Sequence, residues 1–249
     1  MDFLRFFTIV EAERDSLNPI GSDQLDRLAT AVGLQDGQRV LDVGSGKGAL
    51  SRRWAMRTAL QGTGVDLNPA FVASAREWAG AQGLAGHLTF LEGAALDLWP
   101  TLEAQGPYDV ATCLGATFAL GGFGPTLEHL HGVLRPGGTL VVGDVFLAAP
   151  ATPEALAAEG WADLPTLAAR REALAAAGLD LNSLIVSGQN DWDHYSRLAW
   201  SAARRWAEAN PEDPDRAEVL WLVAEGQARY LRFEREHLGW AVFVARVDE

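Results

Sequence analysis

The sequence predicts an α/β protein built on a doubly wound, mostly parallel sheet of seven strands, with a helical cap. Short apolar runs typical of buried strands alternate with longer segments typical of helices. Glycine- or proline-containing turns separate most of these segments. The alternation stops near residue 190, where a long helical stretch precedes one last apolar run. Strands that alternate with helices pair in parallel and bury both faces of their sheet, whereas the helical stretch is left as an addition.

The expected elements follow one another in a regular order. Ser22 is a suitable N-cap for a helix that Gly33 ends, and Pro69 suits the first turn of a later helix. Apolar runs predict strands at residues 39–43, 62–67, 87–91, 108–114, 139–147, 179–187 and 239–247. Helices are expected at residues 22–33, 49–60, 69–82, 126–134 and 164–178. The stretch 191–237 is expected to hold two helices separated by the turn Asn210–Pro214.

This order divides the chain into four segments. Residues 1–38 are expected to form an N-terminal helical cap segment, and residues 39–190 the core. Residues 191–238 are expected to form a helical insertion or lid, and residues 239–249 the final strand of the core sheet. The insertion and this strand carry five of the nine tryptophans, which favours a lid that packs on the sheet or closes over an apolar ligand.

Composition limits the kinds of partner. The chain has a formal charge of −13 at pH 7 and one cysteine among 249 residues. The negative charge argues against a general phosphate-binding surface, so we expect a small-molecule partner and no nucleic acid. One cysteine permits no internal disulfide and no cysteine zinc cluster, so we expect a cytoplasmic protein without a metal site. No apolar run is long enough to cross a bilayer, and the first residues lack the pattern of a secretory signal.

Three alternate glycines follow the first expected strand. In the stretch VLDVGSGKGAL, Gly44, Gly46 and Gly48 stand just after Asp42. Glycines at the carboxyl end of a strand let the backbone turn sharply and approach a ligand without collision. Asp66 ends the next strand, where its carboxylate can accept hydrogen bonds from both hydroxyls of a ribose. The combination predicts a site for an adenosine-type nucleoside.

The glycine motif resembles motif I of the class I S-adenosylmethionine-dependent methyltransferases, and GVDLNP resembles the motif that follows it. YDVATCLGATFALGGF and LRPGGTLVVGD resemble the fourth and fifth strands of that family. With RFFTIVEAERDSLNP and REHLGWAVFVAR at its ends, the whole chain resembles a bacterial group of methyltransferases of the YjhP type. The resemblance implies that residues 39–190 are a Rossmann-like core that binds S-adenosylmethionine, releases S-adenosylhomocysteine and methylates a small molecule. The cofactor contacts it implies are Asp42, Gly44, Ser45, Gly46, Gly48, Asp66, Leu67, Gly93, Ala94, Ala95, Cys113 and Leu114.

One position departs from the family pattern. Many relatives end the third strand with an acid that binds the adenine amino group, whereas this chain has Ala94 there. Either Asp97 in the next turn substitutes for that acid, or the backbone of Ala95 holds the edge of the ring alone. Asp97 would in the second case be a simple acid at a helix N-terminus. Loss of one such hydrogen bond would cost about 1 kcal/mol of cofactor binding. In the same family Asp42, or a water molecule that it holds, would face the ammonium group of the cofactor.

The sequence leaves the catalytic residues and the acceptor open. A sulfonium is an activated electrophile, so the enzyme has mainly to align the acceptor and exclude water. A general base is needed only for a protonated acceptor such as a hydroxyl. Asp144 is either that base or a hydrogen-bond acceptor within its loop, while Cys113 fits a buried core residue. His194 and Tyr195 either contact the acceptor or only pack the cap.

Two other functions are compatible with the same turn. A NAD(P)-dependent oxidoreductase would use the glycines for a dinucleotide, but the spacing G-x-G-x-G differs from the G-x-G-x-x-G of such sites. A non-catalytic module would bind S-adenosylmethionine or another nucleoside without turnover.

Overall fold

The computed structural model describes residues 1–247, and a sheet of seven strands in the order β3–β2–β1–β4–β5–β7–β6 forms its centre. The parallel strands are β1 (Arg39–Val43), β2 (Gln61–Asp66), β3 (Leu88–Glu92), β4 (Tyr108–Leu114) and β5 (Leu134–Leu147). β7 (Leu238–Arg246) lies antiparallel between β5 and β6 (Asp180–Val186). The predicted seven-stranded, mostly parallel sheet is confirmed. The end of the expected final strand, residues 248–249, lies outside the described residues.

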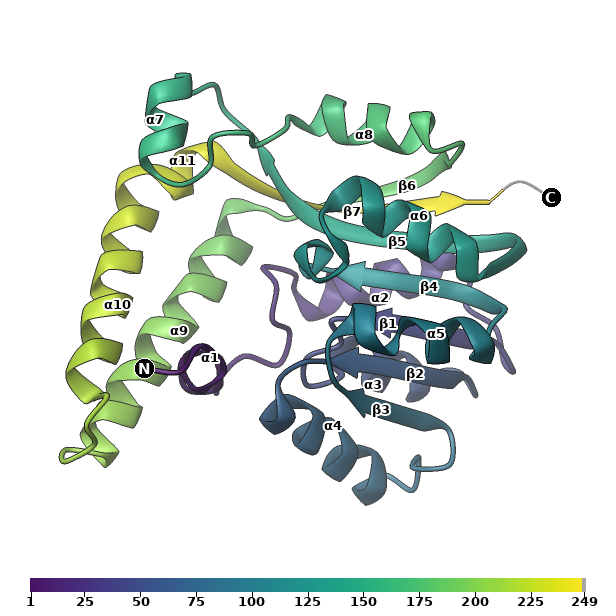
Figure 1. Ribbon diagram of the computed structural model, residues 1–249, viewed down its shortest axis with the longest axis horizontal. Coiled ribbons are helices and arrows are strands. Elements are labelled where there is room, and N and C mark those ends of the chain that lie inside the picture. The colour runs from purple at the N-terminus through teal and green to yellow at the C-terminus, as the bar shows by residue number, and fades with distance from the viewer. Residues whose placement is uncertain (248–249) are drawn as a thin grey trace.

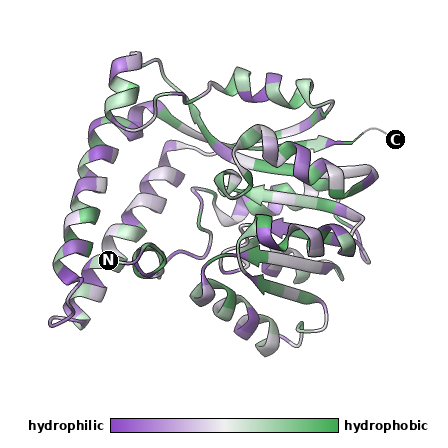
Figure 2. Ribbon diagram, viewed as in Figure 1, coloured by the Kyte–Doolittle hydropathy of each residue, from purple (hydrophilic) through white to green (hydrophobic). Residues whose placement is uncertain are grey.

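Helices cover both faces of the sheet (Figure 1). One face carries α5 (Ala95–Gln105), α6 (Phe123–Val133) and α8 (Leu167–Ala176), which share an apolar cluster with β4, β5 and β7. The other face carries α2 (Ser22–Val32), α3 (Ala49–Ala55) and α4 (Pro69–Ala81), which share a second cluster. Figure 2 shows hydrophobic residues concentrated along the strands. A sheet that is buried on both faces explains why its strands appear in the sequence as nearly continuous apolar runs.

The strand order reverses beside β1. The chain passes from β1 outward to β2 and β3, and then returns to place β4 on the other side of β1. Val43, the last residue of β1, pairs with Val65 of β2 and with Cys113 of β4. In an open parallel sheet, a ligand crevice forms at the carboxyl ends of two neighbouring strands whose following connections leave in opposite directions. The segment after Val43 therefore enters such a crevice.

Helices from both parts of the chain form the cap. α9 (Gln189–Ala209) and α10 (Arg216–Arg229) pack side by side, and α1 (Phe3–Val10) packs against α9 (Figure 1). These three helices share a small apolar core of their own. Its buried members are Ile9, Val10, Ala203 and Val219. The cap is therefore held together partly by its own contacts, separately from the two clusters on the sheet.

Residues 1–38, expected as a single cap segment, divide in the structure. α1 joins the cap, whereas Leu25, Leu28 and Val32 of α2 pack into the apolar cluster on the sheet. The sequence predicts this helix from Ser22 and Gly33 at its ends, but which surface the helix covers depends on tertiary packing.

Short helical turns complete the chain. They are η1 (Thr117–Leu120), α7 (Pro153–Ala158), the π-helical turn η2 (Tyr230–Glu234) and α11 (Arg235–His237). Over residues 1–247, no helix combines the length and the apolar character needed to span a membrane.

Candidate functional site

The glycine loop, residues 44–48, joins β1 to α3 in the crevice. Gly44 and Gly46 have positive φ angles of 71° and 53°. A Cβ atom at Gly44 would lie 2.2 Å from Cβ of Ala116, and one at Gly46 would lie 2.6 Å from Cδ1 of Leu17. The backbone conformation therefore favours glycine at both positions, and at Gly44 the fixed methyl group of Ala116 leaves no space for a side chain, whereas at Gly46 the end of the Leu17 side chain could shift.

Asp66 ends β2 and contacts the glycine loop from the side. Its Oδ2 accepts a hydrogen bond from the N–H of Gly46 at 2.7 Å, and its Oδ1 accepts one from the N–H of Asn68 at 2.8 Å. Because a carboxylate oxygen has two lone pairs, each oxygen can accept a further bond from a ligand. Burial raises the pKa of Asp66, and the two N–H donors oppose that rise. A direct hydrogen bond thus joins the glycine motif to Asp66 of the following motif.

Asp42 lies in the interior just before the loop, with only 3% of its surface exposed. Oγ1 of Thr112 donates a hydrogen bond to its Oδ1 at 2.6 Å. Burial raises the pKa of Asp42 to about 7; the Thr112 hydroxyl opposes the rise, and the charge of Asp66 adds to it. Asp42 and Ser45 line a small hollow of about 30 Å³. Within the described chain, the buried Oγ of Ser45 has no hydrogen-bond partner, so the hollow offers polar groups to a ligand.

A cavity of about 460 Å³, the main cavity, opens beside the glycine loop. Its lining is mostly apolar and includes seven of the predicted cofactor residues: Gly44, Asp66, Leu67, Gly93, Ala94, Ala95 and Leu114. Other lining residues come from the N-terminal segment, from η1 and from α9, and include Phe3, Phe7, Glu11, Asn18, Phe118 and Tyr195. A larger hollow, of about 680 Å³, lies at the amino ends of the strands, and the residues that line it include none of the predicted site residues. We therefore assign the site to the main cavity.

Two predicted cofactor residues, Gly48 and Cys113, are not among the described residues that line the main cavity. Gly48 packs closely, since a Cβ there would lie 2.9 Å from the ring of Phe90. Cys113 is fully buried in β4, and burial raises the pKa of its thiol. Asp97 is exposed in the first turn of α5, and the described lining of the main cavity does not include it. This placement favours its interpretation as an acid at a helix N-terminus.

The three catalytic candidates have different surroundings. Asp144 accepts a hydrogen bond from Oγ1 of Thr117 at 2.9 Å and pairs with Arg170 at 3.0 Å. His194 is exposed on α9 and contacts Arg197. Among the described residues, the lining of the main cavity includes Tyr195 but neither Asp144 nor His194. The contacts of Asp144 favour its structural interpretation over that of a general base.

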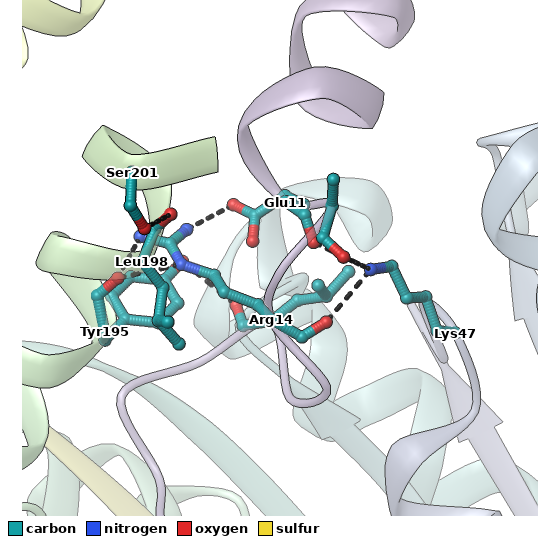
Figure 3. Close-up of polar contacts among 8 residues, drawn as sticks. Glu11, Arg14, Lys47, Tyr195, Leu198 and Ser201 are labelled. Carbon is teal, nitrogen blue, oxygen red and sulfur yellow. Dashed lines mark hydrogen bonds and ion pairs between the residues drawn. The ribbon is translucent and has the colours of Figure 1, made fainter. Parts of the chain in front are cut away.

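A segment that the sequence motifs did not reveal, the strap (residues 11–18), follows α1 and crosses the glycine loop. Nζ of Lys47 donates hydrogen bonds to the carbonyl oxygens of Glu11 at 2.7 Å, Ala12 at 3.1 Å and Arg14 at 3.0 Å (Figure 3). At the other end, Nδ2 of Asn18 donates to the carbonyl oxygen of Leu114 at 3.0 Å. The strap is thus bonded to both the loop and the tip of β4. The sequence held one hint that Lys47 has a special role, because it is the only lysine of the chain.

Tyr195 links the strap to α9 (Figure 3). Its hydroxyl donates to the carbonyl oxygen of Leu17 at 3.1 Å, and its own carbonyl oxygen accepts from Nε and Nη2 of Arg14 at 2.9 and 2.6 Å. The guanidinium carbon of Arg14 also lies 3.3 Å from the centroid of the Tyr195 ring. Burial raises the pKa of the Tyr195 hydroxyl, which therefore stays protonated. These contacts join the cap, the strap and the glycine loop.

Comparison with known proteins places this site in a family. A model of the methyltransferase domain matches residues 40–138. The uncharacterized protein YjhP of Escherichia coli (strain K12) is 35% identical to this chain over 98% of both chains. The crystal structure of a SAM-dependent methyltransferase from Geobacter sulfurreducens in complex with S-adenosyl-L-homocysteine is 34% identical and covers 97% of both chains, with a TM-score of 0.89. Erythromycin 3''-O-methyltransferase of Saccharopolyspora erythraea is 31% identical over 68% of this chain and 53% of that protein.

These similarities confirm the predicted family, fold and cofactor, and they favour a methyltransferase over a nicotinamide oxidoreductase. The likeness to the Geobacter structure extends over both the core and the cap, because it covers nearly the whole chain. The chain therefore belongs to the S-adenosylmethionine-dependent methyltransferases, in the group that includes YjhP.

Proposed function

We propose that the protein transfers a methyl group from S-adenosylmethionine to an apolar small molecule bound in the main cavity. The strongest support is the mostly apolar lining of a cavity that also contains Asp66 and the glycine loop. Phe7 and Phe118 contribute aromatic surface to this lining, and burial of apolar surface is the main driving force for binding such a ligand. A relative named for the O-methylation of erythromycin supports a small-molecule acceptor.

The residues at the site fit the cofactor. Gly44 and Gly46 leave room where a side chain would collide with Ala116 or Leu17. Asp66 can accept hydrogen bonds from both ribose hydroxyls, while Asp42 and the Ser45 hydroxyl, which has no partner among residues 1–247, would contact the amino-acid end. When bound, the cofactor supplies an activated methyl group. The remaining proposed contacts are those of the adenosine pocket: Leu67, Gly93, Ala94, Ala95 and Leu114.

The strap and the cap would control access to this site. The small hollow at Asp42 and Ser45 has room for only one or two water molecules. An amino-acid group therefore requires the strap residues Asp15–Asn18, which line the same hollow, to move outward. We assign a lid function to the strap together with α1, α9 and α10. Their closure would exclude water and align the acceptor, and positioning alone can lower a reaction barrier by several kcal/mol.

The location of the protein in the cell is a separate proposal. Cys113 is the chain's one cysteine and is a free, buried thiol. A chain without disulfides suits a reducing compartment, which favours the cytoplasm.

Binding and turnover test the proposed function separately. S-adenosylhomocysteine should raise the midpoint of thermal unfolding, whereas NAD should leave it unchanged. Transfer of a tritiated methyl group from S-adenosylmethionine to a panel of apolar alcohols and amines should then identify acceptors. Stabilisation by NAD and not by S-adenosylhomocysteine would refute the cofactor site. Binding of S-adenosylhomocysteine without transfer to any apolar molecule would favour the non-catalytic module.

A further inference from the structure

Glu11 is a residue with a buried side chain that is among the residues lining the main cavity. It is 3% exposed and belongs to the lining residues. Its Oε1 pairs with Nη1 of Arg14. Its Oε2 is also buried, and among residues 1–247 it has no hydrogen-bond partner. Buried carboxylate oxygens are rarely left unpaired, because removal from water without a new partner is unfavourable.

The side-chain donors of Arg14, Lys47 and Tyr195, which meet at the strap, are bonded to acceptors other than Oε2 of Glu11 (Figure 3). Arg14 uses Nη1 for Oε1 and directs Nε and Nη2 to the carbonyl oxygen of Tyr195, so the pair with Glu11 involves one oxygen only. Lys47 donates to three main-chain carbonyl oxygens, and the hydroxyl of Tyr195 donates to Leu17. These contacts account for the donors and leave Oε2 without one.

We infer that Oε2 of Glu11 binds the methyl acceptor, and that the acceptor is an apolar molecule carrying an ammonium or hydroxyl group. This inference rests on the proposed function, because it places the acceptor in the same cavity. The apolar body would contact Phe7 and Phe118, which line the cavity with Glu11. The donor group would pair with Oε2, and an ammonium would gain the larger benefit because both partners are charged. A molecule with a carboxylate in that place would be rejected by like-charge repulsion.

Three probes with a phenyl ring on a short chain test this preference. They are 2-phenylethylamine, 2-phenylethanol and 3-phenylpropionate, titrated by calorimetry into the protein saturated with S-adenosylhomocysteine. We expect the amine and the alcohol to bind at least tenfold more tightly than the propionate. Glu11→Gln keeps the shape of the side chain and an oxygen for Arg14, but can present an N–H donor in place of Oε2. We expect it to lose at least tenfold in affinity for the amine.

Glu13→Gln is the matched control. Glu13 lies on the same strap, but its carboxylate accepts a hydrogen bond from Ser201 at 2.8 Å and pairs with the exposed Arg205 at 2.9 Å. Its variant should bind all three probes as the wild type does. A loss of amine affinity as large as that of the Glu11 variant would show that the effect comes from the strap as a whole and would overturn the assignment.

The wild-type measurements decide the question even if the Glu11 variant does not fold. If no probe binds, or if the propionate binds as tightly as the amine, the inference is wrong. S-adenosylhomocysteine binding, measured in the same samples, tests the proposed cofactor site independently. A crystal structure with S-adenosylhomocysteine and the amine should place the nitrogen within hydrogen-bond distance of Oε2 of Glu11; a nitrogen bound elsewhere would also overturn it.

Discussion

Replacement of Asp66 by alanine tests the residue at which the two cofactor motifs meet. Its carboxylate would accept hydrogen bonds from both ribose hydroxyls of the cofactor. A single hydrogen bond to a charged group contributes about 1.5–3 kcal/mol. Two hydrogen bonds to the same carboxylate are not additive, so we take about 1.5–3 kcal/mol as the contribution of both together. S-adenosylhomocysteine should therefore bind roughly 10- to 150-fold more weakly to Asp66→Ala than to the wild type.

The same carboxylate also has a structural role that must be separated from ribose binding. It accepts hydrogen bonds from the N–H groups of Gly46 and Asn68, so the variant should lose about 2 kcal/mol of unfolding free energy as well. Adenosine and 2',3'-dideoxyadenosine distinguish the two roles, because the second compound lacks both hydroxyls. The wild type should prefer adenosine, whereas Asp66→Ala should bind both compounds equally.

Calorimetry with S-adenosylhomocysteine, adenosine and 2',3'-dideoxyadenosine provides the assay. Asp97→Ala is the control, since Asp97 is an exposed acid on the neighbouring α5, and its variant should match the wild type. Unchanged affinity of Asp66→Ala for S-adenosylhomocysteine would refute the assignment. So would a variant that still prefers adenosine, because the hydroxyls would then have another partner.

Three further changes test other parts of the site. Because the pKa of Asp42 is raised to about 7, its carboxyl group is neutral at lower pH and cannot pair with an ammonium. Calorimetry should therefore show that S-adenosylhomocysteine binds more tightly at pH 8 than at pH 6, and that Asp42→Asn loses this dependence; a flat wild-type profile would contradict it. Gly44→Ala should cost about 3 kcal/mol in urea unfolding, from its φ of 71° and the 2.2 Å approach to Ala116. Gly33→Ala is the control, because Gly33 has a similar φ of 69° but no atom lies within 4 Å of the new Cβ. This variant should lose only about 1 kcal/mol of unfolding free energy. An equal loss in both variants would show that the lack of space at Gly44 has no effect. Lys47→Met removes three hydrogen bonds to the strap and should lower stability by about 2 kcal/mol. It should also speed hydrogen exchange in residues 11–14, and unchanged exchange there would mean that Lys47 does not hold the strap.

Local patterns predicted the sheet and the family for physical reasons. The strands are buried on both faces, so their apolar runs stand out from the flanking turns. Asp66 ends β2 and Gly46 lies in the loop just after β1, and the carboxyl ends of these parallel strands must lie at the same edge of the sheet. Their closeness was therefore expected from the order of the elements, whereas the hydrogen bond of 2.7 Å from the N–H of Gly46 to Oδ2 of Asp66 is a finding of the structure.

The rest of the site depends on contacts between distant parts of the chain. His194 and Tyr195 are neighbours in sequence, but successive residues of a helix point about 100° apart. Only Tyr195 of these two lines the main cavity in the described structure, and the sequence does not give the rotation of α9. The interpretation of Asp144 required its pairing with Arg170. Glu11 belongs to a charged stretch that looks solvent-exposed until Arg14 and the cap bury it.

A crystal structure of the protein with S-adenosylhomocysteine tests the central claim most directly. The glycine loop and Asp66 are expected to hold the ribose, with both hydroxyls within hydrogen-bond distance of the Asp66 carboxylate and the sulfur facing the main cavity. A ribose that lies away from Asp66, or a ligand bound outside the main cavity, would contradict the account.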